Sequence, residues 1–160
     1  MVQVFEMDHL SAQLAKHLRE VFFGGNWTCS NLKDQLKDVT YIQANQQVSS
    51  CNTIISLTYH IQYYVQSILQ VMNGGALDSK DIYSYDHPKM DNQMQWEEFQ
   101  QSIWSSVESL ASQIELMPNE NYQNIFVDEK YGNYYRNILG LIEHTHYHLG
   151  QIALLKKIIN

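Results

Sequence analysis

The sequence predicts an all-α protein, a four-helix bundle, and three observations support this fold class. The 160-residue chain has four long segments in which apolar residues recur every three or four positions, the spacing of amphipathic helices. Glycine and proline, which end helices, are few, with seven and two copies. Apolar alternation of period two, typical of strands, is absent over any useful length. Four such helices predict one domain over residues 1–160, with a shared core.

Each expected helix has its own apolar stripe and its own boundary signals. The long helices are expected over about residues 5–23, 50–73, 91–117 and 131–159. The stripes consist of Leu10, Leu14, Leu18 and Val21; Ile54, Leu57, Ile61, Ile68 and Val71; Trp96, Phe99, Ile103, Val107, Leu110, Ile114 and Met117; and Ile138, Leu141, Ile142, Leu149, Ile152, Leu155 and Ile159. Residues that cap or stop helices lie at the boundaries: Gly24-Gly25, Ser49 or Ser50, Gly74-Gly75, Asp91 or Asn92, and Pro118. A shorter helical piece is expected around Leu32 to Val39, and the connections 74–90 and 118–130 are longer than a minimal bundle needs.

The bulk properties exclude several classes of protein. The formal net charge is −7, from 10 basic and 17 acidic residues, which argues against nucleic acid as a partner because phosphate binding needs clustered basic residues. No stretch approaches the roughly 18 apolar residues of a membrane span. The N-terminal residues do not resemble a signal peptide, and Cys29 and Cys51 are too few for a disulfide framework. We therefore expect a cytoplasmic protein. Its two cysteines are expected to be reduced and to pack as small hydrophobic side chains.

Three histidines are the strongest candidates for a functional site. His144 and His148 are four residues apart on the fourth expected helix, so their imidazoles lie one turn apart on one face, whereas His146 points away. His60 lies on the second expected helix, on a face that also carries hydroxyl side chains. Two histidines at this spacing and a third from a facing helix would give a three-nitrogen site for a divalent metal, with positions left open for water or substrate. Imidazole suits zinc, nickel, iron and copper, so the pattern does not name the metal.

The same histidines also have a structural interpretation. A pair spaced by four residues is often a surface pair, and a lone histidine in a helix is often a hydrogen-bonded core residue. In that case the bundle would serve only to dimerise. Gln151 is interpreted either as a surface residue or as a hydrogen-bond partner that orients an imidazole. Glu143 is interpreted as a solvated residue, and Gly150 as a position that allows close helix packing near the site.

Two motifs carry a resemblance to a known family. The run from Gly140 to Ile152 resembles the C-terminal signature of the DinB/YfiT-like family, His-xxx-His-x-Gly-Gln-Ile. The segment from Thr53 to Ile61 resembles that family's second-helix motif, in which a leucine shortly precedes a single histidine. The order and separation of the histidines also match.

This resemblance implies a four-helix bundle in a mirror variant of the up-and-down topology, with a divalent metal on His60, His144 and His148. Zinc or nickel is the expected ion. Some relatives look like transferases that use low-molecular-weight thiols, and others are described as metal-dependent hydrolases. Dimers are common in the family, so a homodimer is expected here. The resulting hypothesis is a metal-dependent enzyme, a thiol-dependent S-transferase or a hydrolase, that acts on small molecules. The alternative is a non-catalytic stress-response module that binds a metal or a small ligand.

Overall fold

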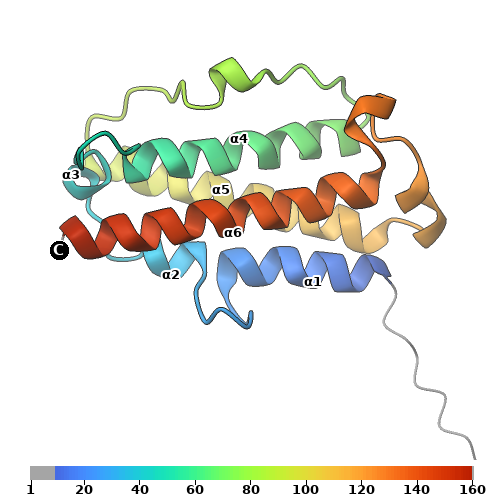
Figure 1. Ribbon diagram of the computed structural model, residues 1–160, viewed down its shortest axis with the longest axis horizontal. Helices are drawn as coiled ribbons and strands as arrows, with labels where there is room; N and C mark the ends of the chain where they lie inside the picture. Colours follow the sequence, from blue (N-terminus) through green and yellow to red (C-terminus); the bar gives the residue numbers. More distant parts are fainter. Residues whose placement is uncertain (1–9, 160) are drawn as a thin grey trace, which may run out of the picture.

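The computed structural model describes residues 10–159, and within them the chain is helical (Figure 1). The helices are α1 (Leu10–Phe23), α2 (Leu32–Leu36), α3 (Tyr41–Ala44), α4 (Ile54–Met72), α5 (Gln93–Leu116) and α6 (Tyr134–Ile159), with short 3-10 turns at Asp81–Tyr83, Asn119–Gln123 and Glu129–Tyr131. The described residues contain no strand, only an isolated bridge between Ile125 and Asn133. The predicted all-α class and the bundle of four long helices are confirmed. The part of the first predicted helix at residues 5–9 lies outside the described residues.

The four long helices pack side by side, and α1 and α2 lie end to end along α6 (Figure 1). In this view α4 and α5 both run from left to right, whereas α1 and α6 run the opposite way. Because α4 and α5 are neighbours with the same direction, the chain between them, residues 73–92, must return along the length of the bundle. We call this segment the crossover.

Helix ends follow local chemistry, with one correction. The side chain of Thr53, and not of Ser49 or Ser50, caps α4 by accepting a hydrogen bond from the backbone N–H of Ser56. Asn92 caps α5 in the same way, as predicted. Gly24 and Gly74, with φ of 108° and 82°, take the left-handed conformation that ends α1 and α4. The piece predicted near Leu32 forms as α2, but α3 has too few residues to show an apolar period and was missed.

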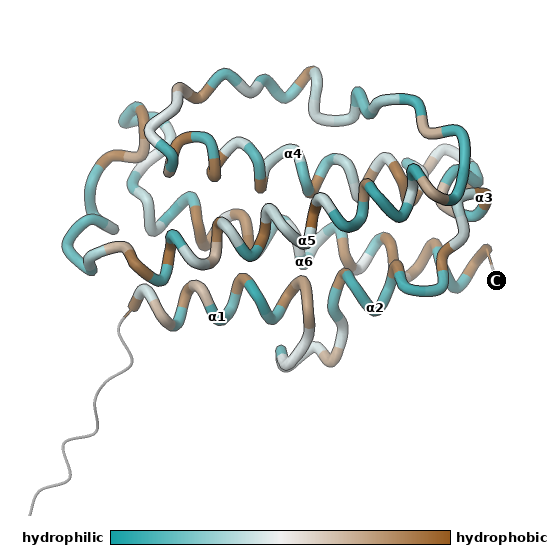
Figure 2. Tube along the Cα trace, turned by 180° about the vertical axis from the view of Figure 1, so that it is seen from behind, coloured by the Kyte–Doolittle hydropathy of each residue, from teal (hydrophilic) through white to brown (hydrophobic). Residues whose placement is uncertain are grey.

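The core is continuous and rich in aliphatic side chains, and two large aromatic residues are buried in it near opposite ends of α5. Figure 2 shows hydrophobic stretches that recur along the long helices between hydrophilic ones. Trp96 is 0% exposed, and its indole Nε1 donates a hydrogen bond to the carbonyl of Val39 at 2.9 Å. Tyr122 is also fully buried, and its hydroxyl donates to the carbonyl of Ile114. None of the described helices has both the length and the apolar character needed to cross a membrane.

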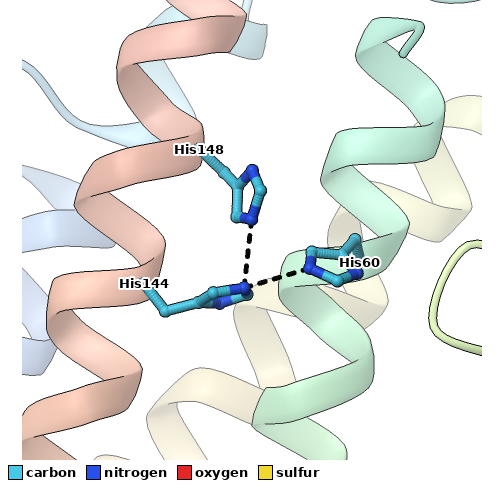
Figure 3. A group of neighbouring side chains, drawn as sticks. All are labelled: His60, His144 and His148. Carbon is cyan, nitrogen blue, oxygen red and sulfur yellow. Dashed lines mark hydrogen bonds between the residues drawn. The ribbon is translucent and has the colours of Figure 1, made fainter. Parts of the chain in front are cut away.

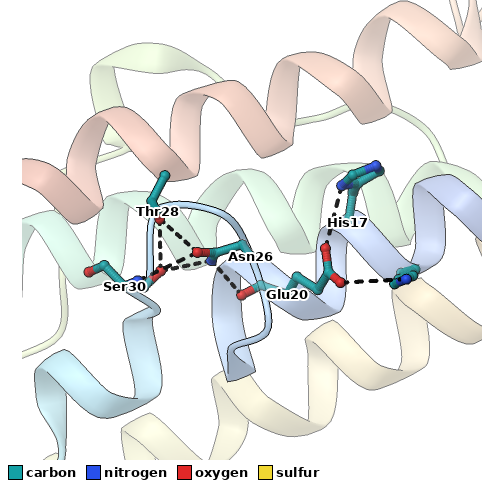
Figure 4. Close-up of polar contacts among 6 residues, drawn as sticks. His17, Glu20, Asn26, Thr28 and Ser30 are labelled. Carbon is teal, nitrogen blue, oxygen red and sulfur yellow. Dashed lines mark hydrogen bonds and ion pairs between the residues drawn. The ribbon is translucent and has the colours of Figure 1, made fainter.

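The turn between α1 and α2 is organised by Asn26 (Figure 4). Its amide donates to the carbonyls of Glu20 and Ser30, and its oxygen accepts from the hydroxyl of Thr28 at 2.7 Å. Cys29 follows with a φ of 50° and is exposed. Cys51 is exposed as well, so both thiols are free, as predicted, but neither packs as a small hydrophobic side chain.

Candidate metal centre

Helix geometry brings three imidazoles together between α4 and α6. His144 and His148 lie on successive turns of α6, and His60 lies in the second turn of α4. His60 and His148 are buried, 6% and 5% exposed, and His144 is partly buried. The four-residue spacing predicted that His144 and His148 share one face, and the family resemblance implied that His60 faces them. The structure places all three rings within one cluster (Figure 3).

The Nε2 atoms of the three rings point at one another. Nε2 of His144 is 3.0 Å from Nε2 of His60 and 3.0 Å from Nε2 of His148. One ligand nitrogen from each ring lies within 4.8 Å of the others, and no other described group of three or more His, Cys, Asp or Glu side chains meets this criterion. Such a set of three nitrogen donors is the kind that binds a divalent ion.

The hydrogen-bond arrangement of the rings fits a cation better than protons. Nδ1 of His148 donates to Oε1 of Gln151 at 2.6 Å, which leaves its Nε2 with a free lone pair. A neutral His144 can place at most one proton in its two Nε2 contacts, so one pair of nitrogens meets without a hydrogen between them. A cation at the centre would accept all three lone pairs. Of the two interpretations of Gln151, this contact favours the one in which it orients an imidazole, and such partners fix the tautomer of metal ligands.

Burial keeps these rings neutral. Burial and the neighbouring His148 lower the pKa of His60 to about 4, and burial together with the other two histidines lowers the pKa of His144 to about 4. Burial also lowers the pKa of His148, and the hydrogen bond that His148 donates to Gln151 opposes this shift by raising the pKa. Within the described residues, the buried Nδ1 atoms of His60 and His144 have no hydrogen-bond partner. Neutral imidazoles are the form that binds metal, so near neutral pH the three rings are in the protonation state that a metal ligand requires.

The lowered pKa values predict that the metal-free protein loses stability in mild acid. As the pH falls below about 6.5, the unfolded chain binds protons at His60 and His144 that the folded chain does not bind until about pH 4. We expect the free energy of unfolding to drop by about 2 kcal/mol for each of these two histidines between about pH 7.5 and pH 5. Urea unfolding of chelator-treated protein at several pH values in this range measures the drop in the free energy of unfolding. The His60→Asn, His144→Asn double variant should show a flatter profile, and an equal slope in both proteins would contradict the assignment.

The crossover covers one side of the histidine cluster. The ring of Tyr85 stacks on His60, with ring centroids 4.0 Å apart and an angle of 8° between the planes. The hydroxyl of Tyr64 donates to Oδ1 of Asp81 at 2.7 Å, and the ring of Tyr64 meets His60 and His144 edge-on. Burial, helped by Asp81, raises the pKa of Tyr64 to about 12, so its proton stays on the phenol. The sequence analysis missed Tyr85 and Asp81, and the unusual length of this connection was the one signal that could have found them.

A pocket of about 680 Å³ opens beside the cluster. It lies between α4 and the N-terminal half of α6 and is bordered by the crossover and by the α5–α6 connection. His144 lines it, as do Tyr64 and Ser67 from the face of α4 on which hydroxyl side chains were noted. A small molecule in this pocket would therefore contact one of the three converging imidazoles.

Other residues singled out in the sequence lie away from this centre. His146 lies on another side of α6, where it lines a separate pocket with His17 and Glu20, the pair shown in Figure 4. Glu143 is exposed and forms a surface ion pair with Arg136 at 3.6 Å, as expected of a solvated residue. The prediction for Gly150 is wrong, because a Cβ atom at this position would meet nothing within 4 Å.

Comparison of the chain with protein-family models, with curated proteins and with solved structures gives no match. The assignment of function is therefore based on the geometry of the site.

Proposed function

We propose that this chain is a metal-dependent enzyme in which His60, His144 and His148 hold one divalent ion, zinc or nickel, next to a small-molecule pocket. The observation that carries the proposal is the convergence of three Nε2 atoms at 3.0 Å contacts inside the bundle. Three imidazole donors are the ligand set of several catalytic zinc sites, which keep a position for water or substrate. Such an ion supplies Lewis acidity and lowers the pKa of a water or thiol that it coordinates.

The protein's own residues would orient the ligands and restrict access. Gln151 holds His148 in the tautomer whose Nε2 faces the centre. The edge of Tyr64 fixes the positions of His60 and His144, and its hydrogen bond to Asp81 ties the crossover to α4. Tyr85 shields the face of His60, so that solvent and substrate approach from the pocket side of His144.

The pocket favours an enzyme over a storage or sensing module. A non-catalytic metal site would be expected to be sealed, whereas His144 here lines a pocket large enough for a small organic molecule. The reaction proposed is either thiol transfer to an electrophile, with a low-molecular-weight thiol as cosubstrate, or hydrolysis. Membership of the DinB/YfiT-like family, the mirror variant of the bundle, a homodimer and a cytoplasmic location are parts of the same proposal. The residues of the two motifs support it, because His60, His144, His148 and Gln151 meet in space.

The decisive experiment combines metal analysis with two assays on protein purified without a histidine tag. We expect about one zinc or nickel ion per chain, removed by a chelator with a fall in melting temperature. The loaded protein should turn over either a thiol with model electrophiles or a panel of esters and amides. Absence of metal under saturating zinc would refute the metal site. Stoichiometric metal with no turnover in either assay would refute the enzyme and leave the binding module.

A further inference from the structure

Positive charge gathers at the pocket beside His144. The chain has 10 lysines and arginines against 17 acidic residues, and three of those 10, Lys80, Lys130 and Arg136, line this one pocket. They come from three separate parts of the fold: the crossover, the α5–α6 connection and α6. In a protein of formal net charge −7, such a cluster makes the pocket wall locally cationic.

The arginine and one of the histidines reach the pocket from the same helix. Arg136, Gly140 and His144 follow one another at intervals of four residues, so Arg136 and His144 lie about 80° apart around the axis of α6, and both line the pocket. Nη1 of Arg136 lies 3.2 Å from the position that a Cβ atom at residue 140 would take. The guanidinium therefore lies over Gly140 on the pocket wall, and a side chain at residue 140 would make it shift by a few tenths of an ångström. The rise of the helix places the Cα atoms of Arg136 and His144 about 12 Å apart.

The acidic groups nearby leave the cationic wall available. Asp81, whose carboxylate accepts a hydrogen bond from Tyr64, is the acidic residue on the described pocket wall, so one negative charge stands against the three positive ones. Glu143 meets Arg136 at 3.6 Å, but both side chains are more than half exposed, and ion pairs of this kind contribute little. The rest of the wall includes apolar side chains, namely Ile68, Leu77, Phe126 and Leu141.

From this arrangement we infer that the pocket binds a small organic anion, with an apolar body against these side chains and a carboxylate or phosphate group on Arg136, supported by Lys80 and Lys130. The bound acid would hold the rest of the molecule against His144. As a statement about substrate class, the inference depends on the proposed function, whereas the anion site itself does not require the metal. Guanidinium is the side chain best suited to this task because it offers two parallel donors to a carboxylate or phosphate.

The test is a calorimetric titration of the full chain, both chelator-treated and zinc-loaded. The probes are 4-phenylbutyrate, its uncharged amide and phenyl phosphate. We expect both anions to bind at least tenfold more tightly than the amide, and the tighter anion identifies the preferred head group. The advantage of the anions should shrink as salt is raised.

Three variants locate the interaction. Arg136→Gln should weaken binding of the anions about tenfold or more without changing binding of the amide. Lys157→Gln removes one positive charge from the end of the same helix, outside the pocket, and should leave binding unchanged. Gly140→Ala keeps every charge but crowds the guanidinium, so it should weaken the anions by a smaller factor while its higher helix propensity maintains the melting temperature.

The outcomes separate this inference from the proposed function. Equal binding of acid and amide, or equal losses in the Arg136 and Lys157 variants, would overturn the anion site. Anion binding that needs zinc and His144 but not Arg136 would also overturn it, because the ion would then be the partner. Anion binding through Arg136 in a protein that takes up no zinc would support the anion site and refute the metal-dependent enzyme.

Discussion

His144→Ala is expected to weaken the binding of zinc or nickel by more than about 100-fold, the upper range seen when only a supporting partner of a metal ligand is removed. His144 is the central donor of the cluster, since its Nε2 contacts the Nε2 atoms of both His60 and His148. Without His144, only two donor nitrogens remain, Nε2 of His60 on α4 and Nε2 of His148 on α6. Competition titration against a chelating dye measures the change in affinity.

The matched control is His146→Ala, two residues along the same helix on another side, which should bind metal like the original protein. Thermal unfolding supplies a second measurement. Zinc at about 1,000 times its Kd should stabilise the original protein and the control by about 4 kcal/mol, and the His144 variant hardly at all. Equal stabilisation of all three proteins would place the metal elsewhere.

Trp96→Ala is expected to cost about 3–5 kcal/mol of folding free energy, a large part of the 5–15 kcal/mol available to a typical domain. The substitution empties a fully buried site in the first turn of α5, where the indole is 0% exposed. It also removes the donor that satisfies the carbonyl of Val39, the link between the α2–α3 region and α5. Urea and thermal unfolding would both report the loss.

Trp27→Ala is the control for this substitution, because the same side chain there is 102% exposed in the α1–α2 turn. It should change stability by less than about 0.5 kcal/mol. Similar losses in the two variants would mean that Trp96 does not anchor the core. The Trp96→Phe variant, which keeps most of the volume but lacks the donor, should fall between them and separate the contribution of packing from that of the hydrogen bond.

The long helices and the histidine cluster were predictable because both depend on the regular geometry of a single helix. The period of Trp96, Ile103, Val107 and Leu110 defines a buried face without reference to the rest of the chain. The pairing of His144 with His148 follows from one turn of α6 in the same way. That His60 would face this pair needed more than periodicity, and the resemblance of the two motifs supplied that expectation.

The parts that escaped sequence analysis depend on contacts between distant residues. The path of the crossover is set by the hydroxyls of Tyr63 and Tyr64, which bond to Lys80 and Asp81 seventeen residues further on, and no local pattern encodes such pairs. The cationic pocket wall escaped for the same reason. Lys80, Lys130 and Arg136 are scattered in the sequence, and only the packing of the connections against α6 gathers them.

The segment between Met72 and Gln93 is longer than the connection of α4 to α5 requires, and the additional residues contribute to the histidine site. Nineteen residues of α4 rise about 28 Å, a distance that about nine fully extended residues would span. The crossover contains roughly twice that number, and the additional length lets Tyr85 reach the ring of His60. A shortened crossover that lacks Tyr85 should therefore uncover the ring of His60 while the four long helices keep their arrangement.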